Sequence, residues 1–187
     1  MNTDNQLIQQ VLDGHQKAFG ELVKRYQNKM YSVCLSILKK PDEAQEATQD
    51  TFIKMHRSLD KYNAEAKFSS WLYKIAYRTS LDYLRKRKST VDIEVVDYAS
   101  SHQENGTEAA INNAELTSQL QKALTYLKPD EAGLVRMFYL KELSIKELEE
   151  VTGMSKSNIK VKLFRARKKL SEIISQHFSE IENYLSI

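Results

Sequence analysis

Apolar residues recur every three or four positions along most of the chain, which is the spacing of amphipathic helices. Pro41 interrupts this pattern, because proline cannot continue a helix but suits the first turn of the next one. Strand-like runs are scarce apart from VDIEVV at 91–96. The pattern predicts helices over residues 4–39 with a break near Gly14, about 42–59, about 69–88, and again from about 114 onward. We therefore predict an all-α fold.

The apolar pattern stops between residues 89 and 112, where Ser, Thr, Asn, Gly and acidic residues dominate. So few apolar groups cannot offset the entropy cost of ordering the chain. Residues 89–121 contain six acids and no Lys or Arg. We therefore predict two small helical domains, residues 1–88 and 113–187, joined by a flexible acidic linker at 89–112.

The second domain contains the clearest local motif. Ser144 and Glu147 have the spacing of a capping box at the start of a short helix, and Gly153 supplies the backbone freedom that ends it. Ser155 or Ser157 can cap the next helix, which carries seven Lys or Arg and no acid in its first fourteen positions. This pattern predicts a helix-turn-helix whose second helix fits the major groove of DNA. The alternative is a helical hairpin with a solvated basic face.

The first domain contains a second cluster, KFSSWLYKIAYR at 67–78 followed by RKRK at 85–88, in which aromatic rings alternate with cations. Bases stack on rings while Lys and Arg follow phosphates, so this composition suits single-stranded nucleic acid. Trp71 shares an apolar stripe with Ile75, which favours core packing for that ring. The net charge is only +3, but two basic patches separated by an acidic tract indicate two contacts with one polyanion.

Enzymatic chemistry has no support in the sequence. The four His are isolated, and metal-ligand spacings, a glycine-rich phosphate loop and a nucleophile motif are all absent. We therefore expect no enzyme activity, no metal, no cofactor and no small-molecule substrate. Cys34 is the single cysteine and lies in an apolar run, so we expect a buried thiol in a reducing compartment. Without a membrane-length apolar stretch or a signal-peptide pattern, we expect a cytoplasmic protein.

Four segments resemble the motifs of bacterial RNA polymerase sigma factors of the extracytoplasmic-function (ECF) type, within the sigma-70 family. Their order and spacing match the family, and together they span nearly the whole chain. The segments are LIQQVLDG at 7–14 with Ala18-Phe19, ATQDTFIK at 47–54, FSSWLYKIA at 68–76 and IKVKLFRAR at 159–167. Asp50 departs from the Glu that the family often has, and Glu149 departs from its frequent Ala.

The resemblance implies a subunit that binds core RNA polymerase, directs it to specific promoters and helps to open the −10 region. The first domain would bind the polymerase and the −10 element, and the second the −35 element. The linker would run through the active-site cleft and the RNA exit path, with its acids imitating nucleic acid. An anti-sigma factor is a further expected partner. The helix at 42–59 would dock on a coiled coil of the largest polymerase subunit through Asp42, Glu43, Glu46, Gln49, Asp50 and Lys54.

The resemblance also implies which residues contact promoter DNA. One non-template base would enter a pocket beside the 61–67 loop. The expected −10 contacts are Tyr62, Asn63, Lys67, Phe68, Ser69, Trp71, Lys74, Tyr77, Arg78, Arg85 and Lys86. The expected −35 contacts are Ser155, Ser157, Asn158, Lys160, Val161, Phe164, Arg165, Arg167 and Lys168. Among these, Arg165 suits bidentate contact with guanine, while Arg167 and Lys168 suit phosphates.

One competing interpretation is a stand-alone helix-turn-helix regulator that binds duplex DNA as a dimer. It explains the second domain equally well. It leaves the aromatic and basic cluster of the first domain and the acidic linker without a role.

Overall fold

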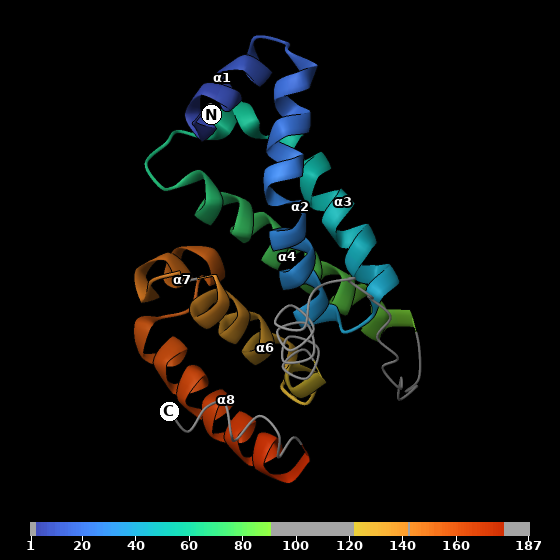
Figure 1. The fold of residues 1–187 in the computed structure, drawn as a ribbon, viewed down its shortest axis with the longest axis vertical. Helices are drawn as coiled ribbons and strands as arrows, with labels where there is room; N and C mark the ends of the chain where they lie inside the picture. The colour runs from blue at the N-terminus through green and yellow to red at the C-terminus, as the bar shows by residue number, and fades with distance from the viewer. Residues whose placement is uncertain (1–2, 91–121, 142, 178–187) are drawn as a thin grey trace, which may run out of the picture.

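The computed structural model describes residues 3–90, 122–141 and 143–177, and all regular structure in these ranges is helical (Figure 1). The predicted all-α class is therefore confirmed for the described residues. The linker was expected to begin at residue 89, but residues 89 and 90 still belong to the helix that starts at Phe68. The rest of the expected linker and the helix expected at 114–121 lie outside the described residues. The helices are α1 (Asp4–Leu12), α2 (Gln16–Leu38), α3 (Pro41–Arg57), η1 (Leu59–Lys61), α4 (Phe68–Thr90), α6 (Pro129–Val135), η2 (Arg136–Leu140), α7 (Ile145–Thr152) and α8 (Lys156–His177).

The first unit, residues 3–90, is a bundle in which α2, α3 and α4 pack on one another and α1 packs against α2. The predicted break near Gly14 is confirmed, because α1 ends at Leu12 and Gly14 has a φ of 89°. Pro41 begins α3, as predicted. The predicted end of α3 near residue 59 is wrong by two residues, because the chain tightens into the 3-10 turn η1.

The second unit comprises residues 122–141 and 143–177. Apolar residues at helical spacing continue through Leu134 and Leu140, and this stretch forms α6 followed by a π-helical turn, η2. The predicted capping box is confirmed: the Glu147 backbone N–H donates to Ser144 Oγ at 3.2 Å, and the Ser144 N–H donates to Glu147 Oε2 at 2.8 Å. Gly153 ends α7 with a φ of 73°. α7 and α8 therefore form the predicted helix-turn-helix.

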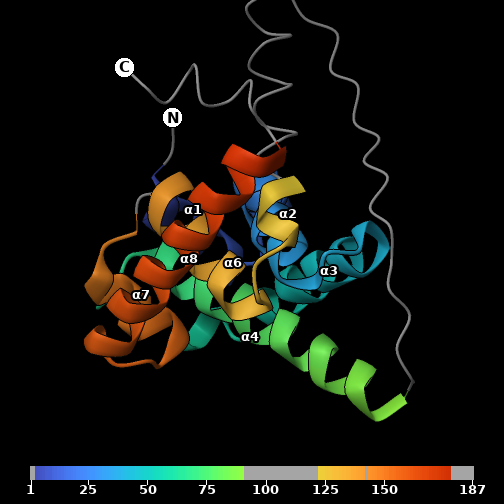
Figure 2. The same cartoon turned by 90° about the horizontal axis from the view of Figure 1, so that it is seen from below.

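The two units share one hydrophobic core. α6 packs against α2, and α7 packs against α4 (Figures 1 and 2). Leu124, Leu127 and Leu134 of the second unit are at most 1% exposed and belong to the same cluster as Leu72 of the first. The second unit is therefore held directly over two helices of the bundle.

The Cys34 thiol is fully buried, as expected, and burial raises its pKa. It therefore packs as a small apolar group. No described helix is both long and apolar enough to cross a membrane.

Candidate nucleic-acid and partner surfaces

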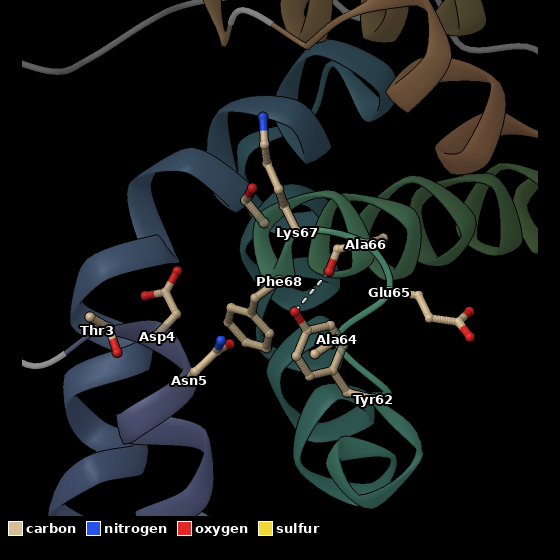
Figure 3. A pocket seen from close by; sticks show the side chains of 10 residues that line it. Thr3, Asp4, Asn5, Tyr62, Ala64, Glu65, Ala66, Lys67 and Phe68 are labelled. Atoms are coloured by element: carbon tan, nitrogen blue, oxygen red, sulfur yellow. Dashed lines mark hydrogen bonds between the residues drawn. The ribbon is translucent and has the colours of Figure 1, made fainter.

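A pocket of about 460 Å³ lies between the first turn of α1 and the loop that leads into α4 (Figure 3). Thr3, Asp4 and Asn5 form one side, and Tyr62 and residues 64–69 form the other. Figure 3 shows the Asn5 side chain directed toward the Phe68 ring. The pocket is thus wide enough for a nucleobase and combines polar and aromatic groups.

Aromatic rings support the loop side of this pocket. The Tyr62 and Phe68 rings meet edge to face with centroids 5.5 Å apart, and Trp71 lies 5.4 Å from Tyr62 and 5.8 Å from Phe68. The Tyr62 hydroxyl donates to the Ala66 carbonyl at 2.8 Å. Ala64 has a φ of 59°, a left-handed conformation that is rare outside glycine. The loop is therefore held in one strained shape by the ring cluster beneath it.

Asp4 fixes the other side of the pocket. Its carboxylate accepts a hydrogen bond from the Tyr26 hydroxyl and pairs with Arg25, both at 2.5 Å. Burial, followed by the bond to Asp4, raises the pKa of Tyr26, so the phenol remains a protonated donor at neutral pH. These bonds join α1 to α2 and hold the first turn of α1 at the pocket.

The sequence did not single out Thr3, Asp4 and Asn5 as functional residues. Thr3 and Gln6 form a capping box, which is a sequence signal for the start of a helix. That signal locates α1 in the chain. It does not reveal that α1 folds back against the 62–69 loop.

The expected −10 residues differ in accessibility. Asn63, Lys67, Arg78, Arg85 and Lys86 are exposed, and Tyr62, Ser69, Trp71 and Lys74 are half-buried. Phe68 is only 3% exposed and lies beneath the pocket, so its ring supports the site from below. Tyr77 is 2% exposed, and burial raises its pKa to about 12. Tyr77 therefore lies in the core of this structure and not on the DNA-binding surface that the sequence analysis expected.

The expected polymerase-binding residues all lie on α3. Asp42, Glu46, Gln49 and Lys54 are exposed. Glu43 pairs with Arg87 of α4, and Asp50 accepts a hydrogen bond from the Tyr83 hydroxyl at 3.0 Å. Lys54 Nζ also donates to Thr79 Oγ1 at 3.0 Å and pairs with Asp82 of α4. α4 therefore supports this surface through Glu43, Asp50 and Lys54, and leaves Asp42, Glu46 and Gln49 open to a partner.

The nine residues expected to contact the −35 element are all exposed on α8 or in the turn before it. Ile159, Leu163 and Ala166 are buried on the opposite side, at 0%, 5% and 1% exposure. Phe164 stands out because its ring is 60% exposed, although burying a Phe side chain is favourable. The exposed face of α8 is therefore basic with an apolar centre.

The sequence left two capping residues open for α8, and the structure favours the first. The Asn158 N–H donates to Ser155 Oγ at 3.4 Å. The Lys156 N–H donates to Glu149 Oε1 at 2.7 Å, so the departure from Ala at position 149 supplies a second acceptor at the start of this helix. Glu149 thus stabilises the start of α8.

The family models for Sigma-70 region 2 and Sigma-70, region 4 match residues 22–90 and 117–170, which correspond to the two helical units. The chain is therefore a two-region sigma factor of the sigma-70 class. The chain is also similar in fold to CnrH, solved with the cytosolic domain of CnrY, at a TM-score of 0.67 and 23% identity over 94% of this chain and 99% of that one. RpoE of Bartonella quintana, solved with the anti-sigma factor NepR, gives a TM-score of 0.69 and 22% identity over 85% and 98% of the two chains.

Sequence relatives narrow this class. The ECF RNA polymerase sigma factor SigW of Bacillus subtilis is 30% identical over 172 residues, or 87% of this chain and 92% of the relative. The ECF RNA polymerase sigma-E factor of Escherichia coli K12 is 30% identical over 175 residues, or 88% and 91%. The chain belongs to the ECF family of RNA polymerase sigma factors. It directs RNA polymerase to promoters, and the alternative of a stand-alone regulator is wrong. Sigma factors are initiation factors and not enzymes.

Proposed function

We propose that α3 docks on the polymerase, that the pocket beside residues 62–69 takes a non-template base of the −10 element, and that α8 reads the −35 element. The pocket carries this proposal, because it joins an aromatic cluster to the start of a basic helix. Stacking on rings is how proteins hold an unpaired base, and cations follow its backbone. The exposed surface of α3 is polar and carries acidic groups. This composition is usual at the rim of a protein–protein interface.

The boundaries of the two functional domains follow from the same proposal. Residues 1–88 would bind polymerase and the −10 element, and residues 113–187 the −35 element. The matches at 22–90 and 117–170 support this division. An anti-sigma factor is a proposed partner, since RpoE of Bartonella quintana was solved with one. A protein with these partners would act in the cytoplasm.

Substitution of two exposed cationic residues of α8 tests whether this helix recognises the −35 element. Arg165→Ala should cost about 1–3 kcal/mol and relax base preference at one position, if its guanidinium contacts a base edge. Lys168→Ala should weaken binding similarly on all sequences and lower the salt slope by about one counterion, if its ammonium contacts phosphate. Both residues are exposed, so neither change should unfold the chain.

Binding of each variant holoenzyme across −35 base substitutions and salt concentrations distinguishes the two roles, with circular dichroism as the folding control. Equal, sequence-independent losses from both variants would show that Arg165 is another phosphate contact. No loss from either would remove this face of α8 from the proposed −35 interface.

A further inference from the structure

The first turn of α1 lies outside the region 2 match at 22–90, yet it forms one side of the pocket. Asp4 fixes this turn to α2 through Tyr26 and Arg25. Asn5, the next residue, is exposed and directs its side chain toward Phe68 (Figure 3). A polar side chain on a fixed turn therefore faces the aromatic side of the pocket.

An Asn side chain carries a donor and an acceptor next to each other, the combination that pairs with a base edge. The rings of the 62–69 loop offer stacking surface that does not distinguish one base from another. Resting on the proposed function of the pocket, we infer that Asn5 selects the base that enters it. α1 would then be a specificity element of −10 recognition.

Asn5→Ala tests this inference in the holoenzyme. We expect it to flatten the preference at one −10 position by about 5- to 150-fold, the range of one bidentate pair, while preference at other positions persists. Gln9→Ala is the matched control, because Gln9 is an exposed amide of the same helix whose side chain bonds Asp13 outside the pocket. Promoter opening is measured on DNA carrying each base at each −10 position.

The outcomes separate this inference from the pocket itself. Unchanged base preference in Asn5→Ala, with defective opening in Tyr62→Ala, would overturn the role of Asn5 and leave the pocket in place. Normal opening and normal preference in both variants would overturn the pocket assignment as well. An equal loss of preference in Gln9→Ala would show an effect of α1 stability and would also count against Asn5.

Discussion

Charge reversal on α3 is expected to reduce the affinity for core RNA polymerase by about a hundredfold or more. Glu46→Lys combined with Gln49→Lys places two cations on the surface that we assign to docking. Like charges brought together at an interface cost several kcal/mol, and about 2.7 kcal/mol corresponds to a hundredfold. Both side chains are exposed, so the bundle should fold normally. The dissociation constant of the holoenzyme measures the effect.

A matched control separates docking from net charge. Glu21→Lys combined with Asn28→Lys also raises the net charge by three and changes exposed residues, but on α2. This control should bind polymerase normally. If both double variants bind equally well, α3 is not the docking surface; if both bind equally poorly, the loss reflects overall charge.

The second large effect is expected in the pocket. Tyr62→Ala removes a ring that meets Phe68 and Trp71, and stacking contributes about 1–3 kcal/mol per base. Promoter opening should fall by about 5- to 150-fold, while polymerase binding persists. Tyr62→Phe retains the ring and loses the hydrogen bond to Ala66, so it should open promoters better than Tyr62→Ala.

Permanganate footprinting of unpaired −10 thymines measures this opening. Tyr139→Ala serves as a control, because Tyr139 is 46% exposed in η2 of the second unit, away from the pocket. Opening by Tyr62→Ala at the level of the unmodified holoenzyme would exclude Tyr62 from the mechanism.

The features that the sequence predicted well depend on neighbouring residues. The capping box of Ser144 and Glu147 and the glycine turn at Gly153 act within a few positions, so the helix-turn-helix could be predicted closely. The exposed and buried faces of α8 follow from helical periodicity. The basic and apolar residues of the expected −35 interface, on the exposed face of α8, could therefore be predicted from the sequence.

The features that escaped prediction depend on contacts between distant segments. Tyr77 has the composition of a nucleic-acid contact but lies under α6, because Gly133 allows the second unit to approach it. Asn5 belongs to the pocket only because Asp4 binds Tyr26, which is 22 residues away. Periodicity assigns a residue to a face of its helix, but it does not say what covers that face.

The π-helical turn η2 illustrates the same limit. The apolar spacing from Leu134 to Leu140 suits an ordinary helix, and no local residue marks a π turn. Arg136, at the start of this turn, is 8% exposed and bonds Ser36 of the first unit. A buried Arg is stable only with such partners, and Ser36 is 100 residues away in the chain.

Run-off transcription with purified core polymerase, with and without this chain, tests the central claim most directly. On a library of genomic promoter fragments, we expect transcripts with defined starts only when both are present, and all of them downstream of a shared pair of −10 and −35 sequences. Specific retention of duplex DNA by the chain alone, with no new transcripts when polymerase is added, would contradict the account.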